Sequence, residues 1–176
     1  MTPRPPTPSR TSRKRTALKL DGYLPFRLAV ASAWVSKLIS KTYEQKFGLT
    51  IPQWRVIAIL GDEGPMSQQQ MAQRSIMDKI ATHRAASALK EKGILSTTDA
   101  QDRRFKILEL TNYGRKVFED VAPLALELEK ELLKLARVSD IRNLERDLLE
   151  LEAAARHLYE EMEQPGESTS DENKAD

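Results

Sequence analysis

Apolar residues recur at steps of three and four along most of the chain, which is the spacing of amphipathic helices. Over residues 22–46 they form a stripe broad enough to predict one long helix with a wide buried face. A second helix is expected over 52–60, because Pro52 suits a first helical turn and Gly61 and Gly64 follow. The pattern therefore predicts a mainly α fold.

The next segment predicts two short helices joined by a turn. Ser67 and Gln70 have the spacing of a capping box for a helix that ends near residue 74, and after a turn a second helix is expected over 77–92. We assign its inner face to Ile80, Ala81, Arg84, Ala85, Ala88 and Leu89. The side chains expected to project outward are those of Lys79, Thr82, His83 and Ala86.

After Gly93 the hydrophobic period changes from helical to alternating. Residues 94–98 and 105–110 predict two short strands of a β-hairpin around a polar tip. Thr111 is then expected to cap a long helix bent at Pro123, and Ser139 a last helix. The apolar stripes of these two helices are longer than one small core can absorb, so we expect a homodimer.

Composition supports one helical domain with charged ends. The 176 residues are 40% hydrophobic, 31% charged and only 6% aromatic, and the formal net charge is +2. Basic residues are concentrated near the start of the chain and acidic residues near its end. We expect a disordered basic arm over 1–20, a folded domain over 21–163 and a disordered acidic tail over 164–176. The arm either contacts phosphates or is only a solubilising tail.

Several function classes are excluded by what the sequence lacks. Without cysteine there are no disulfides, thiolate zinc sites or cysteine redox sensors. His83 and His157 are the only histidines and fall on different helices, so no metal site is expected. No phosphate loop or nucleophile–histidine pair is present, which indicates a protein that is not an enzyme and needs no cofactor. No apolar run approaches the roughly 18 residues of a membrane span, so we expect a cytoplasmic protein.

Two segments resemble the MarR family of transcriptional regulators. Met77-Asp78-Lys79-Ile80 through Arg84-Ala85 to Ile94 resembles the family's recognition helix, and Asp99 through Arg104 with Leu110-Thr111-Asn112-Tyr113-Gly114 resembles its wing. The resemblance covers roughly residues 24–162 and implies a winged helix-turn-helix dimer, with its DNA-binding part at about 50–111 and long dimerisation helices. Ala81-Thr82-His83 stands where the family usually has Thr-Val-Ser, so the operator sequence cannot be carried over.

The expected DNA contacts fall on the second helix of the pair and on the hairpin tip. Arg84 is expected to reach a phosphate or a base, unless its stem packs in the core and pairs with an acid. Either arginine at the tip can enter a narrow minor groove, and the resemblance favours Arg104 with Asp102 as its partner. The alternative is a surface hairpin with an ordinary ion pair. The complete predicted set is Ser67, Gln68, Lys79, Thr82, His83, Arg84, Asp102, Arg103 and Arg104.

The resemblance also implies a pocket for a small effector where the dimerisation helices meet the winged domain. The candidate residues are Tyr23, Arg27, Trp34 and Arg55, which would bind an aromatic acid or its coenzyme A thioester. Trp34 and Trp54 lie in apolar stripes, and a plain core role is the alternative for both. We expect a repressor that holds two recognition helices about 34 Å apart on a pseudo-palindromic operator and is released by its ligand. The alternative function is a winged-helix module that binds another protein.

Overall fold

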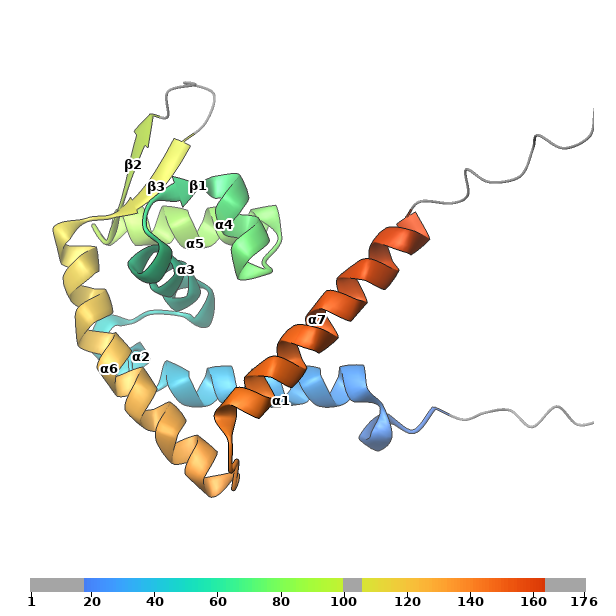
Figure 1. Ribbon diagram of the computed structural model, residues 1–176. Coiled ribbons are helices and arrows are strands. Elements are labelled where there is room, and N and C mark those ends of the chain that lie inside the picture. Colours follow the sequence, from blue (N-terminus) through green and yellow to red (C-terminus); the bar gives the residue numbers. More distant parts are fainter. Residues whose placement is uncertain (1–17, 100–105, 164–176) are drawn as a thin grey trace, which may run out of the picture. The chain divides into compact units, whose positions relative to one another are not determined.

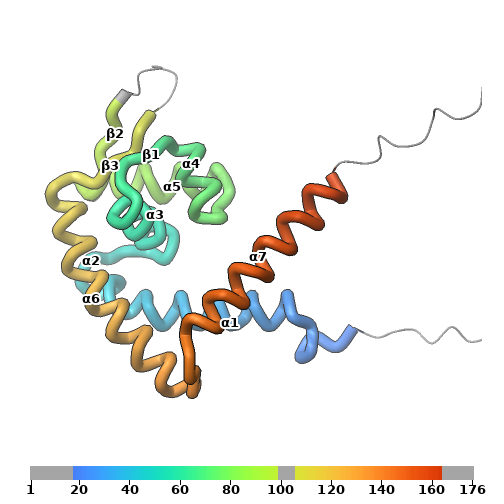
Figure 2. Tube along the Cα trace, viewed as in Figure 1, coloured from blue at the N-terminus to red at the C-terminus, as the bar shows by residue number. Residues whose placement is uncertain are grey.

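The computed structural model describes residues 18–99 and 106–163, and the chain divides into two compact units, residues 1–125 and 126–176. A 3₁₀ turn at Leu20–Gly22 comes first. The elements that follow (Figures 1 and 2) are α1 Leu24–Ser40, α2 Glu44–Phe47, α3 Ile51–Glu63, β1 Met66–Ser67, α4 Gln68–Ser75, α5 Lys79–Glu91, β2 Leu95–Asp99, β3 Lys106–Leu110, α6 Asn112–Leu135 and α7 Ile141–Glu163. The predicted mainly α fold with a small β-hairpin is confirmed.

The described strands form a small antiparallel sheet in the order β1-β3-β2. The predicted hairpin of β2 and β3 is present, with Thr97 opposite Leu108. A strand that the sequence did not predict, β1, pairs with the other edge of β3, with Met66 opposite Leu108. It exists because Gly64, at φ 85°, ends α3 and Pro65 follows, so that the chain runs extended for two residues before α4.

The first predicted helix is interrupted, so the expectation of one helix over residues 22–46 is wrong. Helix α1 ends at Ser40, and α2 is a separate single turn. The hydroxyl of Ser40 donates to the Lys37 carbonyl at 2.9 Å, and the hydroxyl of Thr42 donates to the Ile39 carbonyl at 2.8 Å. Such local hydroxyl–carbonyl bonds compete with the helical pattern, and here they coincide with the end of α1.

The core lies among α3, α4, α5, the sheet and the start of α6. Its fully buried side chains include Val56, Ile57, Leu60, Met71, Leu89, Ile94, Leu108, Val117 and Val121. Trp54 packs on the edge of this core, where its ring stacks between those of Tyr43 and Phe118, with centroids at 5.3 and 6.3 Å. Trp54 is therefore half-buried and packs against the core, as its apolar stripe predicts.

Helix starts are fixed by short side-chain bonds. The predicted capping box of α4 is confirmed, because the Ser67 hydroxyl accepts from the Gln70 N–H at 3.2 Å and the Gln70 side chain accepts from the Ser67 N–H at 2.9 Å. Thr50 and Gln53 make the same arrangement at the start of α3. Helix α5 begins at Lys79 rather than at residue 77, because the Asp78 carboxylate accepts from the Ala81 N–H at 2.6 Å.

The start of α6 is pressed against the end of α5. The Thr111 hydroxyl accepts from the Gly114 N–H at 3.0 Å, as the predicted cap requires, and donates to the Gly93 carbonyl at 2.7 Å. A Cβ on Gly114 would lie 2.1 Å from the carbonyl oxygen of Ile94. The Leu-Thr-x-x-Gly pattern therefore has a steric reason, because only glycine lets the two backbones approach this closely.

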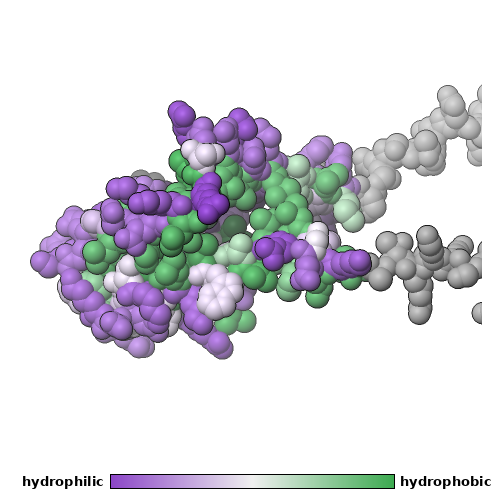
Figure 3. Space-filling view, turned by 90° about the horizontal axis from the view of Figure 1, so that it is seen from below, coloured by the Kyte–Doolittle hydropathy of each residue, from purple (hydrophilic) through white to green (hydrophobic). Residues whose placement is uncertain are grey.

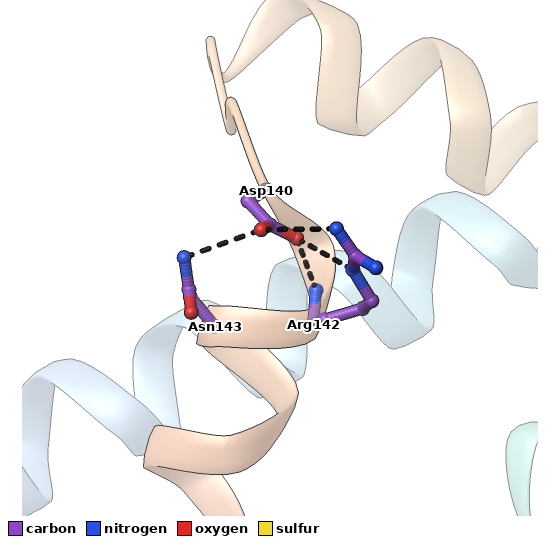
Figure 4. A network of polar contacts seen from close by, with 3 residues as sticks. All are labelled: Asp140, Arg142 and Asn143. Carbon is purple, nitrogen blue, oxygen red and sulfur yellow. Dashed lines mark hydrogen bonds and ion pairs between the residues drawn. The ribbon is translucent and has the colours of Figure 1, made fainter.

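In the second unit, Asp140 starts helix α7 (Figure 4). Its carboxylate accepts from the backbone N–H of Arg142 at 3.0 Å and from the side-chain amide of Asn143 at 3.3 Å. The predicted cap at Ser139 is therefore wrong by one residue. Every residue of α7 is exposed within a single chain, including its leucines. Hydrophobic side chains accordingly take up part of the solvent-facing surface (Figure 3).

No helix in residues 18–99 or 106–163 combines the length and the apolarity that a membrane span needs. In the same ranges no cluster of three or more histidine or acidic side chains is placed to hold a metal ion.

Candidate nucleic-acid interface and adjoining recess

Helix α5 has one buried and one exposed face. The buried face consists of Thr82, Ala85, Ala86 and Leu89. The exposed face carries Lys79, Ile80, His83 and Arg84. Three of these four residues are the predicted DNA contacts Lys79, His83 and Arg84, and all three come from the first two turns of the helix.

The predicted outward projection of Thr82 and Ala86 is wrong. Thr82 is completely buried, and its hydroxyl donates to the Asp78 carbonyl at 2.9 Å, so that the polar group is satisfied inside the core. Ile80, assigned to the inner face, is instead 65% exposed. The helix is therefore rotated relative to the prediction, and Thr82 cannot touch a ligand on the outside.

Arg84 is exposed, which rules out the alternative that its stem packs in the core. Among the described residues no acid pairs with it. By contrast, Arg74 at the end of α4 is held by Glu63 in an ion pair of 2.5 Å. The guanidinium of Arg84 is thus available for an external anion, while that of Arg74 is already occupied.

The first turn of α4 lies beside the first turn of α5. Gln68 and Gln69 line a shallow recess of about 230 Å³ together with Lys79. Ser67, just before them, is half-buried and uses its hydroxyl as the cap of α4. This arrangement puts amide groups, a lysine and the N-terminal ends of two helices around one surface depression, all of which favour an anionic ligand.

The three predicted wing residues, Asp102, Arg103 and Arg104, lie outside the described residues. Strands β2 and β3 lead up to that segment, and the last described pair in the register is Asp99 opposite Lys106. The hairpin that carries the wing is therefore established, and the roles of the three tip residues stay predictions.

A second recess lies between α1 and α3, and we call it the α1–α3 recess. Its volume is about 230 Å³, and its walls are Val35, Ser36, Ile39, Tyr43, Ile51, Trp54, Arg55 and Ala58. Burial raises the pKa of Tyr43 to about 12, although the nearby charge of Arg55 acts in the opposite direction. The phenol is therefore a neutral hydrogen-bonding group at physiological pH.

Arg55 connects the α1–α3 recess to the helix-turn-helix. Its guanidinium donates to the carbonyl of Ser75, the last residue of α4, at 3.2 Å. The following residue, Ile76, has a left-handed backbone at φ 52°, which is unfavourable for a β-branched side chain. One arginine thus touches both the recess and the turn that leads into α5.

Of the four predicted effector residues, only Arg55 lines this recess. Tyr23 and Arg27 are exposed at the start of α1, and Trp34 is 65% exposed with the Lys37 ammonium 5.0 Å from its ring centroid. The core role considered for Trp34 is therefore wrong within a single chain. Sequence reasoning missed Tyr43, although an aromatic residue directly after a predicted buried stripe was a usable signal.

Comparison with known proteins identifies the group to which this fold and surface belong. The model of the MarR family matches residues 47–104, from the end of α2 into the hairpin. A curated relative, the uncharacterized HTH-type transcriptional regulator YwoH of Bacillus subtilis (strain 168), is 30% identical over 108 residues. This match spans 60% of the present chain and 79% of YwoH.

Solved structures agree with the sequence comparison. The MarR/EmrR family transcriptional regulator from Acinetobacter sp. ADP1 is 25% identical, with a TM-score of 0.71 over 80% of this chain and 99% of that one. NadR in complex with 4-hydroxyphenylacetate has the same fold at 20% identity, with a TM-score of 0.68 over 77% of this chain and 99% of NadR. Together with the paired helices α4 and α5 and the hairpin beside them, these matches establish that the chain belongs to the MarR family of transcriptional regulators.

Proposed function

We propose that this regulator binds double-stranded DNA through the exposed face of α5 and releases it when an aromatic acid occupies the α1–α3 recess. The observation that carries the DNA-binding part is the grouping of Lys79, His83 and Arg84 on one exposed face. Arginine reads guanine in the major groove through two hydrogen bonds, and lysine neutralises phosphate. Arg84 is accordingly the base-reading residue, and Lys79 and His83 contact the neighbouring backbone.

Further contacts come from α4 and from the wing. Gln68 at the start of α4 faces the same depression as Lys79 and supplies a phosphate contact, supported by the backbone N–H groups of the helix start. Arg104, with Asp102 as its partner and Arg103 beside it, enters the adjacent minor groove, as the family resemblance implies. Ser67 positions α4 through its capping bond and adds a contact to the DNA backbone.

We further propose that the regulator is a homodimer. Helix α1 exposes Trp34 and Val35, and helix α7 exposes Leu148, Leu151 and Tyr159. Exposed apolar side chains of this kind mark an interaction site on each helix, and a second copy of the chain covers them symmetrically. Two copies present two α5 helices about 34 Å apart, the spacing of half-sites in a pseudo-palindromic operator.

The effector proposal rests on the chemistry of the α1–α3 recess. Tyr43 and Trp54 offer aromatic surface, and Arg55 offers a positive charge beside them. An aromatic carboxylate satisfies both, and the binding of 4-hydroxyphenylacetate by a protein of the same fold supports this class of ligand. An aromatic coenzyme A thioester is the second candidate, with its phosphates in place of the carboxylate as the negative charge for Arg55.

Arg55 also offers a route from ligand to DNA. A carboxylate in the recess draws its guanidinium away from the Ser75 carbonyl and so weakens the bond that holds the end of α4. The position of α5 then changes, and the repressor dimer dissociates from its operator. The size of the effect is limited by the ligand's difference in affinity for the bound and released arrangements.

The DNA-binding proposal is tested by selecting duplexes from a random library with the full chain and measuring affinity against salt. Lys79→Ala is expected to weaken binding to all sequences and to lower the salt slope by about 1, while Arg84→Ala also relaxes the preference at one position. Lys41→Ala is the matched control, because this exposed lysine lies at the end of α1 and pairs with Glu44. Failure to enrich any duplex contradicts the proposal and favours the protein-binding module.

The effector proposal has its own test. Thermal unfolding with 4-hydroxyphenylacetate is expected to show stabilisation, because a ligand that binds only the folded state adds RT ln(1 + [L]/Kd) to its stability. Addition of the selected duplex must then weaken this stabilisation if ligand and DNA oppose one another. Equal ligand affinity with and without DNA contradicts a release mechanism.

A further inference from the structure

Ile80 is an aliphatic side chain in an unexpected place. It lies in the first turn of α5 with 65% of its surface exposed, directly after Lys79 in the chain and one turn before Arg84. The sequence pattern predicts that Ile80 is buried and Thr82 exposed, but Thr82 is the buried residue. Among the described residues, a large apolar group thus stands on the surface that we propose contacts DNA.

We propose that Ile80 contacts the C5-methyl group of a thymine in the major groove and so makes operator recognition depend on a thymine at a fixed position. This inference rests on the proposed DNA-binding function. Thymine is the base that presents a methyl group in the major groove, and apolar side chains recognise it by direct contact. The first turn of a recognition helix is the part that reaches base edges.

The charges around Ile80 favour DNA as the occupant of this surface. Lys79, His83 and Arg84 surround it on the exposed face. The nearby carboxylate of Asp78 is engaged as the cap of α5, where it accepts from the Ala81 N–H. A partner that matches this arrangement carries negative charges around one apolar group. The major groove of DNA at a thymine is such a partner, because phosphates flank it and the thymine methyl group lies within it.

The spacing within the helix also predicts where the thymine lies. Side chains four residues apart on a helix are neighbours, about 5–6 Å apart at Cβ, and successive bases on a strand are about 3.4 Å apart. The thymine contacted by Ile80 is therefore expected within two base pairs of the guanine read by Arg84.

The test uses duplexes selected by the full chain, in which each thymine is replaced in turn by deoxyuridine, which lacks only the methyl group. At one position in each half-site, wild-type binding is expected to weaken about fourfold, the effect of burying about one methyl group. Ile80→Ala is expected to bind the thymine and deoxyuridine duplexes equally at that position. Its circular dichroism and thermal unfolding must match those of the wild type, because an exposed side chain contributes little to stability.

Ile76→Ala is the matched control, because Ile76 is also exposed, at 80%, but lies in the turn before α5. This variant is expected to keep the preference for thymine over deoxyuridine. If duplexes are selected but no position distinguishes the two bases through Ile80, the inference fails while the DNA-binding function stands. If no duplex is selected at all, the proposed function itself fails.

Discussion

Replacing Gly114 by alanine distinguishes the steric effect of the surrounding structure from the effect of helix propensity. The two effects predict changes of opposite sign in the free energy of unfolding. Propensity favours alanine over glycine inside a helix by about 0.5–1 kcal/mol. In the structure, a Cβ at this position would lie 2.1 Å from the carbonyl oxygen of Ile94, whereas real Cβ contacts begin at 3.0 Å. The start of α6 must therefore move away from Ile94, and we expect Gly114→Ala to destabilise the protein.

The size of the effect follows from what that movement disturbs. It lengthens the bond from the Thr111 N–H to the Ile94 carbonyl, now 3.0 Å, and the bond from the Thr111 hydroxyl to the Gly93 carbonyl, now 2.7 Å. Each such bond contributes about 1 kcal/mol net, and forcing a well-packed contact apart costs about 1–3 kcal/mol. After the gain in propensity is subtracted, the expected loss is about 2–4.5 kcal/mol.

The assay is urea unfolding followed by circular dichroism at one fixed protein concentration, since the stability of the proposed homodimer depends on concentration. A lower midpoint with an unchanged slope is expected for Gly114→Ala. Gly22→Ala is the matched control, because a Cβ there meets nothing within 4 Å, and its effect should stay within about 0.5 kcal/mol. A Gly114→Ala protein as stable as the wild type would refute the steric explanation of the Leu-Thr-x-x-Gly pattern.

Three further predictions concern the capping box, the buried tyrosine and the arginine of the recess. Ser67→Ala is expected to lower the free energy of unfolding by about 1 kcal/mol in the same urea assay, because the Gln70 N–H loses its acceptor. Tyr43 should ionise only near pH 12 in an absorbance titration. Because the unfolded chain loses this proton near pH 10, the free energy of unfolding falls between pH 10 and 12. Tyr43→Phe should remove the part of this fall that comes from the tyrosine. Arg55→Met is expected to abolish thermal stabilisation by 4-hydroxyphenylacetate, and a variant that still responds like the wild type would remove Arg55 from the ligand site.

Features that depend on a few neighbouring residues were predictable from the sequence. The capping box at Ser67, the hairpin and the cap at Thr111 are all formed by groups close in the chain. In each case the residue types that make the bonds can be recognised without knowing what packs around them. These local signals also carried the family resemblance, which is why the fold class was predicted correctly.

The rotation of α5 could not be predicted in this way. Both the face centred on Ala81 and Arg84 and the face centred on Thr82 and Ala85 have helical spacing, and alanine fits either environment. The decision depends on Thr82, whose hydroxyl is satisfied by the Asp78 carbonyl and can therefore be buried. A threonine in isolation gives no sign of such a bond, so the pattern placed Ile80 inside and Thr82 outside.

The arrangement of the α1–α3 recess could not be predicted from the sequence for a different reason. A stripe of apolar residues indicates burial but does not say whether the same chain or a second copy covers it, and Trp34 proved to be exposed within one chain. The α1–α3 recess depends on how Tyr43 stacks on Trp54 after α1 has ended at Ser40. That contact is tertiary, so the sequence pointed to Trp54 and Arg55 but not to Tyr43.

Ser67 joins the sheet and the helix pair mechanically, since it pairs with Ile107 of β3 and caps α4 at the same time. The hairpin is consequently not a loose appendage hinged at its base. Because both contacts pass through Ser67, we expect a tilt of β3 to be transmitted to the first turn of α4, so that the hairpin and the helix pair move together. If the helix pair and the hairpin bind DNA as proposed, a duplex whose grooves require a different combination strains this joint, and we expect the affinity to depend on DNA shape as well as on sequence.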